Sequence, residues 1–374
     1  MQTSLSTTLS ASRHGPEIAG CPAGGRSYLR HMSLEHTKAS AQQRSTPSGR
    51  RRNPSPSLSA ERLGRWLAQP ALHCDDGQIL SWLNPAHPGY PYPEASALWL
   101  SWAAWRHEQR LPAPPRQAAR RAAAWLHAQL SGPGAIGRQG RSYAFDTGLA
   151  VHALVRAART PGLIGLDRSD LPSLSAGLDA FLDADQPALP GARGAARWSE
   201  RWGGHMVRAA ALVLQAGLWL DHPPTQQRAR RMLARAVRIQ PDQPCYLHAL
   251  AYQAEGDLLL TSLGVAGLHQ HVPHAAQRLA QLQRPDGLLP GWSDRPDSAR
   301  CDTTAQAVRL WAATDPERFA DAIAAALAAL ARCQQPEGGL PYEPGGLDMN
   351  TWAGLFADQA ARWATHGADP ASLL

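Results

Sequence analysis

An eight-residue motif that occurs twice constrains the fold of this chain more than any other feature. The two copies, Gln283–Pro290 and Gln334–Pro341, both fit Gln-x-Pro-acid-Gly-x-Leu-Pro and begin 51 residues apart. Each copy is followed by a loop rich in Gly, Pro and Asp, and then by a helical pattern that starts near Thr303 or near Asn350. A repeat of this length with two helices per unit predicts an α-helical array.

Four weaker Gly/Pro/Asp loops extend the repeat towards the N-terminus. They lie at Asp75–Gly77, Gly132–Gly134, Pro190–Gly191 and Pro241–Asp242. Together with the two motifs they make six loops, at intervals of roughly 45 to 60 residues. We therefore expect an all-α fold in which six helix pairs close into an (α/α)6 toroid, with six inner helices around a cavity and the loops at one end. An open solenoid is the alternative geometry.

Composition separates a tail from the predicted toroid. Residues 1–60 hold twelve serines, eight basic and two acidic residues and little apolar material, so this segment cannot bury enough surface to offset its ordering entropy. We predict a disordered tail over 1–60 and the toroid domain over 61–374. Met32 is an alternative start, in which case residues 1–31 are not translated.

Charge and residue usage exclude several classes of protein. Residues 61–374 carry 29 basic and 28 acidic groups, which does not favour a nucleic-acid surface. The only lysine is Lys38, so the toroid has none for a Schiff base or a Walker-type loop, and we expect no cofactor. Five scattered cysteines indicate reduced thiols and a cytoplasmic protein. The longest nearly uncharged apolar stretch, Ala209–Leu220, is too short to span a bilayer, and no secretory signal is visible.

The two motifs resemble the repeats of squalene cyclases and prenyltransferase β subunits, which form (α/α)6 toroids. Arg300–Ala305 similarly resembles the Asp-rich motif from which those cyclases protonate their substrate, although Cys301 and Thr303 stand where the cyclases have further aspartates. The cyclase repeat also ends in Trp, whereas this chain has Leu289 and Leu340. This resemblance implies a terpenoid or isoprenoid cyclase-like enzyme as one alternative function.

A longer series of motifs carries a second resemblance. Its members are Phe145–Gly148, Tyr246–Gly256, Cys301–Gln306 and Asn350–Asp358, in that order. They resemble a poorly characterised bacterial family of squalene-cyclase-like repeat proteins that accompany polysaccharide-biosynthesis genes. The resemblance implies an enzyme that acts on a carbohydrate or glycan intermediate, with epimerase, lyase and hydrolase chemistry all open. A non-catalytic toroid that binds a glycan or a partner is a further alternative.

The leading catalytic candidates share one helical face. His248, Tyr252 and Glu255 are spaced four and three residues apart, which places them in line on a helix. We interpret His248 or Glu255 as a general base and Tyr252 as a proton donor or orienting group. The alternative is a polar seam that supports packing.

Asp302 is the candidate for a second acid, at the start of an inner helix beside Cys301. The alternative is that Asp302 or Thr303 caps the helix, with Gln306 completing a capping box. Tyr143 and Asp146 precede another apolar helix, where Asp146 is either a plain N-cap or a group at the cavity mouth. Trp residues in or beside loops are candidates to stack on sugar rings. The predicted substrate-binding residues are Tyr143, Asp146, Trp202, Trp292, Cys301 and Trp352.

Two acidic or histidine clusters have weaker functional interpretations. Cys74–Gly77, close to the aromatic run Tyr90–Glu94, offers paired carboxylates but is more typical of an Asp-Gly turn. His269, His271 and His274 cluster in the sequence, with Cys301 as a possible further ligand, but no zinc-binding motif is present. We therefore predict no metal.

Overall fold

The computed structural model describes residues 57–374, apart from residues 88, 133, 190–199, 241 and 269. The predicted tail up to residue 56, the predicted loop at Pro190–Gly191 and Pro241 lie outside the described residues. The helices are α1 (Ala60–Leu67), α2 (Pro93–Glu108), α3 (Arg116–Ser131), α4 (Ala144–Arg159), α5 (Leu178–Asp183), α6 (Met206–Trp219), α7 (Pro223–Arg235), α8 (Leu247–Ser262), α9 (His271–Gln281), α10 (Cys301–Thr314), α11 (Ala320–Cys333) and α12 (Thr351–His366). Seven short strands lie in the loops: β1 (Trp82–Leu83), β2 (Gly137–Arg138), β3 (Arg141–Tyr143), β4 (Ala188–Leu189), β5 (Leu289–Trp292), β6 (Arg295–Arg300) and β7 (Met349–Asn350).

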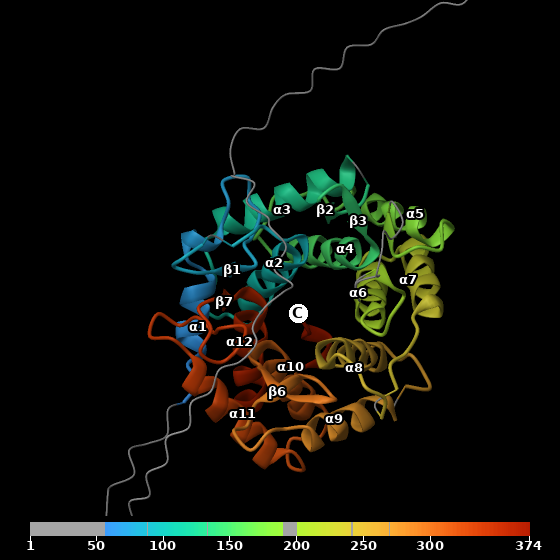
Figure 1. Ribbon diagram of the computed structural model, residues 1–374. Helices are drawn as coiled ribbons and strands as arrows, with labels where there is room; N and C mark the ends of the chain where they lie inside the picture. The colour runs from blue at the N-terminus through green and yellow to red at the C-terminus, as the bar shows by residue number, and fades with distance from the viewer. Residues whose placement is uncertain (1–56, 88, 133, 190–199, 241, 269) are drawn as a thin grey trace, which may run out of the picture. The chain divides into compact units, whose positions relative to one another are not determined.

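Among the described residues the even-numbered long helices form a closed inner ring. Helices α2, α4, α6, α8, α10 and α12 each contact the next, and α12 contacts α2 to complete the circle (Figure 1). The predicted (α/α)6 toroid is therefore confirmed, and the open solenoid is wrong.

An outer layer surrounds the inner helices and explains the amphipathic sequence patterns. It consists of α1, α3, α5 with the preceding 3-10 helix at Leu171–Gly177, α7, α9 and α11. Helix α7 buries Thr225, Ala229 and Met232, which lie three or four residues apart on one face. Helix α2, by contrast, is buried along Pro93–Arg106, because it has neighbours on every side.

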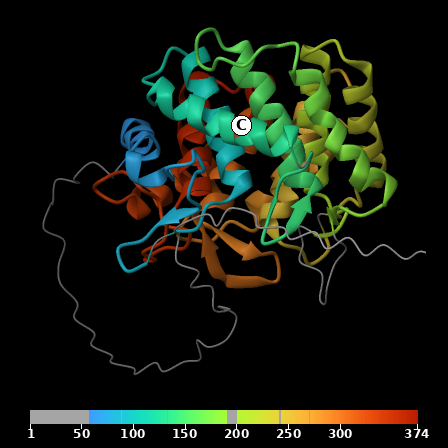
Figure 2. The ribbon, with the colours of Figure 1, turned by 90° about the horizontal axis from the view of Figure 1, so that it is seen from above.

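The short strands lie at one end of the ring, as the view from above shows (Figure 2). Each inner helix begins at this end, which we call the loop end, and finishes at the opposite or far end. The strands pair within or between the loops, as β1 with β7, β2 with β3, β3 with β4, and β5 with β6. The loops that precede the inner helices thus build the only β-structure of the described residues.

The repeated motif fixes each loop against the next outer helix. Gln283 Nε2 donates a hydrogen bond of 2.9 Å to the Ala322 carbonyl in α11, and Gln334 Nε2 donates one of 3.1 Å to the Ser59 carbonyl before α1. Gly287 has φ of 88°, and a Cβ there would collide with the carbonyl of Ala325 in α11. The motif therefore needs glutamine to bridge and glycine to approach closely.

A substitution pair tests the close approach of this glycine. Gly287→Ala should lower the free energy of unfolding by about 3 kcal/mol, because it adds both an unfavourable positive φ and a main-chain clash. Gly140 has a similar φ of 72° but open space around the position of a Cβ. Gly140→Ala should therefore cost only about 1 kcal/mol in urea unfolding, and equal losses for the two variants would contradict the proposed packing.

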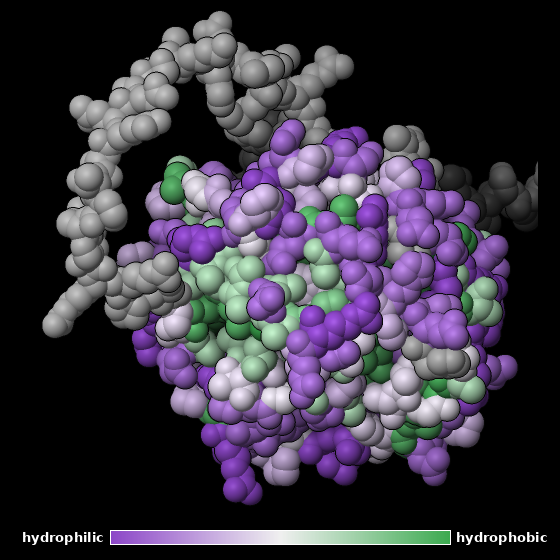
Figure 3. Space-filling model, turned by 90° about the horizontal axis from the view of Figure 1, so that it is seen from below, coloured by the Kyte–Doolittle hydropathy of each residue, from purple (hydrophilic) through white to green (hydrophobic). Residues whose placement is uncertain are grey.

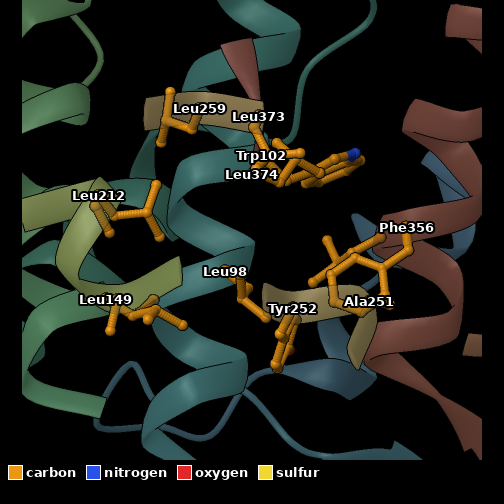
Figure 4. Packing of buried hydrophobic residues seen from close by; sticks show 14 of the residues in the cluster. Leu98, Trp102, Leu149, Leu212, Ala251, Tyr252, Leu259, Phe356, Leu373 and Leu374 are labelled. Carbon is orange, nitrogen blue, oxygen red and sulfur yellow. The ribbon is translucent and has the colours of Figure 1, made fainter. Parts of the chain in front are cut away.

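The far end of the ring is filled. The terminal segment Pro370–Leu374 turns into the ring, and Leu373 and Leu374 are fully buried among leucines of the inner helices, including Leu212 and Leu259 (Figure 4). Arg156 donates to the Ser372 and Leu373 carbonyls at 3.2 and 3.1 Å, and Gln215 donates to the Ala371 carbonyl at 2.9 Å. The terminal segment thus occupies the interior of the ring at this end.

The face of the molecule that Figure 3 shows is mainly hydrophilic. On the face shown in Figure 3, hydrophilic residues surround a smaller group of apolar residues. None of the helices in the described residues combines the length and apolar character that crossing a membrane requires.

Candidate active site at the loop end of the ring

A pocket of about 380 Å³ opens at the loop end, where the inner helices begin. Its wall combines aromatic rings with two arginines and three carboxyl groups. The lining residues are Trp82, Tyr90, Tyr92, Glu94, Arg138, Tyr246, His248, Arg300, Asp302, Tyr342, Asp348, Asn350 and Trp352.

Four of these residues occupy the same position relative to their helices. Each lies two residues after the N-cap residue, so the ring turns all four towards its mouth. They are Glu94 in α2, His248 in α8, Asp302 in α10 and Trp352 in α12.

A recurring hydroxyl fixes where these helices start. In α10, Thr304 Oγ1 donates to the Arg300 carbonyl at 2.6 Å and accepts from Leu289 N of the preceding loop at 2.9 Å. Ser96 in α2 makes the equivalent contacts to Tyr92 and Ile79. The loop and the first helical turn are thereby held together, which fixes the pocket residues at the next positions.

Glu94 forms the acidic centre of the pocket and is only 4 % exposed. Tyr252 donates its hydroxyl to Glu94 Oε1 at 2.6 Å, and the Trp352 side chain also hydrogen-bonds the carboxyl group. Burial nevertheless raises the pKa of Glu94, and these hydrogen bonds together with the charge of Arg208 only partly offset that effect. The environment therefore shifts the carboxyl group towards its protonated form relative to an ordinary glutamate.

Asp146 lies behind the pocket in the first turn of α4. It is 3 % exposed and does not line the pocket, and its Oδ2 has no hydrogen-bond partner among the described residues. Burial raises the pKa of Asp146 well above its ordinary value, the charge of Glu94 raises it further, and Arg138 opposes both. The two carboxyl groups thus oppose each other's ionisation.

Asp302 has the opposite character to Glu94. Arg300 donates to both of its carboxylate oxygens, at 3.1 and 2.8 Å, and Thr303 N donates to Oδ1 at 2.7 Å. Although burial raises the pKa of Asp302, the charge of Arg300 and these hydrogen bonds outweigh it, so the pKa is lowered overall. Asp302 is held as a carboxylate, which does not fit the predicted role of a second acid.

His248 completes a pair with Asp302, with Nδ1 at 3.4 Å from Asp302 Oδ2. Burial lowers the pKa of His248 to about 4, although Asp302 acts in the opposite direction. The imidazole is therefore neutral at pH 7 and can accept a proton, while the adjacent carboxylate would stabilise the resulting cation.

Two arginines give the pocket a positive wall. The Arg300 guanidinium lies 3.2 Å from the centre of the Tyr342 ring, and the Arg138 guanidinium lies 4.1 Å from the centre of the Tyr92 ring. Asp302 neutralises Arg300, whereas Arg138 forms no ion pair with the described residues. A ligand with a negative charge would find its counter-charge at Arg138.

Glu255 is not part of the pocket. Its carboxylate is fully buried deeper in the ring, between Arg208 of α6 and Arg309 of α10, and Gln306 Nε2 donates to it at 3.4 Å. The spacing correctly places Glu255 on the same helix as His248, but seven residues along it. Glu255 as a general base stays a prediction, and the contacts of its carboxylate are those of a buried counter-ion for two arginines.

The helix-capping alternatives are not what the structure shows. Arg300 is the N-cap residue of α10 and makes no side-chain capping bond, while Gln306 reaches Glu255 instead of closing a capping box. Asp146 likewise is not an N-cap, because Tyr143 occupies that position in α4. Asp76 accepts a hydrogen bond of 3.1 Å from Gln78 N beside Gly77, so the Asp-Gly turn is the observed arrangement there.

Of the other predicted binding residues, Trp352 lines the pocket and the rest lie outside its wall. Tyr143 is buried, with Arg138 at 5.8 Å from its ring centre, and Cys301 is buried in α10. Trp292 is 41 % exposed and packs on Tyr246 with ring centres 5.3 Å apart. Trp202 also does not line the pocket, and its main chain accepts a hydrogen bond from Val237 N.

Metal ligation finds no support in the part of the chain that the structure describes, where no group of three His, Cys, Asp or Glu side chains is arranged to hold an ion. His271 and His274 face Asp257 and Asp242, respectively, at 3.6 and 3.9 Å. His269 lies outside the described residues.

Sequence analysis did not select Glu94, Arg138, Arg300 or Tyr342 as site residues. For Glu94 a signal existed, because Tyr92-Pro-Glu94 has the same spacing from its helix start as Arg300-Cys301-Asp302. Arg138 and Tyr342 come from loops, where no periodicity marks which side chains turn inwards.

No protein-family model matches the chain, and no curated protein sequence matches it. Among solved structures it is similar to an unsaturated glucuronyl hydrolase specific for heparin, with a TM-score of 0.57 and 12 % identity over 81 % of this chain and 95 % of that one. The unsaturated glucuronyl hydrolase from Bacillus sp. GL1 gives a TM-score of 0.57 and 16 % identity over 82 % and 95 % of the two chains.

A type II terpene cyclase from Scytonema is also similar, with a TM-score of 0.52 and 16 % identity over 82 % of this chain and 99 % of that one. At these identities the comparisons establish the toroid fold alone. They agree with the fold that the resemblance to squalene cyclases implies, whereas membership in the family linked to polysaccharide biosynthesis stays a prediction.

Proposed function

We propose that this protein is a hydrolase that acts on a glycan carrying a negative charge. The observation that supports this most is the meeting of two groups with opposite proton affinities in one pocket, the buried acid Glu94 and the neutral His248 beside Asp302. Such divergence is typical of an acid and a base that work together. The glucuronyl hydrolases with the same fold are described as acting on glycosaminoglycans or heparin, which agrees with this proposal.

In the proposed reaction, Glu94 and His248 each carry out one proton transfer. Glu94 donates its proton to the glycosidic oxygen, the bond between the anomeric carbon and that oxygen breaks, and the leaving sugar departs as an alcohol. Water supplies the hydroxyl group to the anomeric carbon, and its proton passes to His248. A solvent-mediated proton exchange then returns Glu94 and His248 to their starting states.

The walls of the pocket favour an acidic sugar. Tyr92, Trp82 and Trp352 supply rings that can stack on the apolar face of a sugar. Arg138 forms no close ion pair with the described residues, although the charges of Glu94 and Asp146 act on it, and it can pair with the carboxylate of a uronic acid. A place in polysaccharide biosynthesis is the finer proposal, based on the sequence resemblance.

The terpenoid cyclase alternative is less well supported. A cyclase that begins by protonating its substrate from Asp302 needs that carboxyl group protonated, whereas the charge and hydrogen bonds of Arg300 favour its ionised form. Two arginines in the pocket also differ from the dry aromatic cavity that this alternative predicts.

A substrate panel tests the proposal. The purified protein is incubated with oligosaccharides that end in a saturated or an unsaturated uronic acid, with neutral oligosaccharides of equal length, and with a geranylgeranyl substrate. We expect release of the acidic sugar, measured by chromatography, and loss of this release in His248→Ala with little change in melting temperature. Cleavage of neutral glycans alone, cyclisation, or no product from any acidic glycan would refute the proposal.

A further inference from the structure

Arg208 of α6 lies at the centre of the ring beneath the pocket and is not exposed to solvent. Its guanidinium pairs with Glu255, donates to a main-chain oxygen of Leu374, and lies 4.5 Å from the centre of the Tyr252 ring. One side chain therefore contacts an inner helix, the terminal segment and the tyrosine below Glu94.

Tyr252 connects this arginine to the pocket. Its ring packs on Arg208 on one side and on His248 on another, with 4.3 Å between the ring centres of Tyr252 and His248. Its hydroxyl donates to Glu94 Oε1 at 2.6 Å. Because Tyr252 is fully buried, a change in the position of Arg208 must move the ring or leave a cavity.

The terminal segment in turn fixes Arg208. Gln359 Nε2 donates to the Ser372 carbonyl at 3.0 Å, and Gln359 Oε1 accepts from Arg309 Nη1 at 3.0 Å. Arg309 also pairs with Glu255, so the segment, both arginines and Glu255 form one continuous network. Arg309 lies 4.2 Å from the centre of the Phe356 ring, whereas Arg208 lies closer to Tyr252, at 4.5 Å, than to Phe356, at 5.6 Å.

We infer that Arg208 is a positioning residue for the proposed acid, acting through Tyr252 to hold Glu94 and held in turn by the terminal segment. The part of this inference that concerns catalysis rests on the proposed function, in which Glu94 is the acid. The role is distinct from that of Arg309, which shares the Glu255 contact but lacks the contact with Tyr252.

A titration of Glu94 depends on the charged and titratable groups that surround its carboxyl group. They come from several elements, namely Tyr92 from the residue before α2, Arg138 from β2, Asp146 from α4, Arg208 from α6 and Tyr252 from α8. Arg208 favours the ionised form of Glu94, so removal of its charge should raise the pKa of Glu94.

Two substitutions separate the charge of Arg208 from its geometry. Arg208→Gln removes both the charge and the planar contact with Tyr252, and it should raise the pKa of Glu94 by about one unit. This pKa is measured by 13C NMR of carboxyl-labelled glutamate, with Glu94→Gln as the reference for assigning the signal. Arg208→Lys keeps the charge but not the planar contact with Tyr252. It should therefore leave the pKa of Glu94 within about half a unit of its value in the unmodified protein, while the Tyr252 Cζ resonance shifts. We expect kcat to fall about 100-fold and about 10-fold, respectively, with KM nearly unchanged.

Arg309→Lys is the matched control, because it perturbs the same glutamate without contacting Tyr252. It should leave the Tyr252 resonance and the Glu94 pKa unchanged. If Arg208→Gln fails to fold, Arg208→Lys alone tests the inference. The inference is overturned if Arg208→Lys has the same Tyr252 resonance and the same kcat as the unmodified protein. If the unmodified protein cleaves no glycan, the proposed function fails, while the two NMR readouts still decide whether Arg208 positions Tyr252 and Glu94.

Discussion

Glu94→Gln is expected to lower kcat on an acidic glycan by about 10² to 10⁴-fold, since the amide cannot donate a proton to the leaving oxygen. The substitution keeps the size of the side chain, and Tyr252 and Trp352 can still hydrogen-bond its oxygen. Loss of a buried carboxyl group with a raised pKa should leave the melting temperature nearly unchanged. Steady-state kinetics and thermal unfolding measure the two effects on the same preparation.

Glu343→Gln provides the control, because Glu343 is an exposed glutamate outside the pocket lining. It should keep kcat within about twofold, because the exposed Glu343 side chain does not line the pocket. A Glu94→Gln variant with ordinary kcat would remove Glu94 from the mechanism. In that case Asp146, the other buried carboxyl group with a raised pKa, would be the next acid to test.

The pH dependence of kcat/KM follows from the same two groups. Burial lowers the pKa of His248 to about 4, so activity should fall as the pH drops through that value and the imidazole becomes protonated. Burial raises the pKa of Glu94, so activity should fall again as the pH rises through that higher value and the acid loses its proton. Glu94→Gln should abolish the alkaline limb in any residual activity, and an unchanged alkaline limb would assign it to another group.

Glu255→Gln is expected to lower the free energy of unfolding by about 3 to 5 kcal/mol, the largest stability effect proposed for this chain. The carboxylate is fully buried between Arg208 and Arg309, so its loss removes the negative charge that these two buried guanidinium groups share. Urea unfolding monitored by circular dichroism measures the change, and Glu343→Gln should cost less than about 0.5 kcal/mol.

The outcome for Glu255 also separates its two interpretations. A structural anion predicts a large stability loss, whereas a catalytic base predicts a stable protein without activity. A variant that unfolds at the ordinary urea concentration but has lost kcat would restore Glu255 as a candidate base.

The repeated motif predicts the ring, but the sequence carries less information on how far each side chain lies from the mouth of the pocket. The spacing of His248 and Glu255 identifies a shared helical face, yet seven residues of helix advance about 10 Å along the axis. His248 therefore lines the pocket whereas Glu255 lies in the central network. Only the position of the helix start, fixed by loop contacts such as that of Thr304 with Leu289, decides which turn reaches the mouth.

The cations of the pocket were harder to predict than its acids. Arg138 belongs to a two-residue strand, and Arg300 ends a hairpin, so neither lies in a stretch whose periodicity indicates a direction. Their placement depends on ring contacts with Tyr92 and Tyr342, which come from distant parts of the sequence. Such pairings arise from closure of the ring and leave no local pattern.

The burial of Leu373 and Leu374 at the far end has a consequence for the length of ligand that the ring admits. Because these side chains fill the interior of the ring behind the pocket, a polymer that enters from the loop end cannot pass through the ring. On the proposed function, cleavage would then proceed from chain ends, one small fragment at a time, and each fragment would have to leave before the shortened polymer could re-enter.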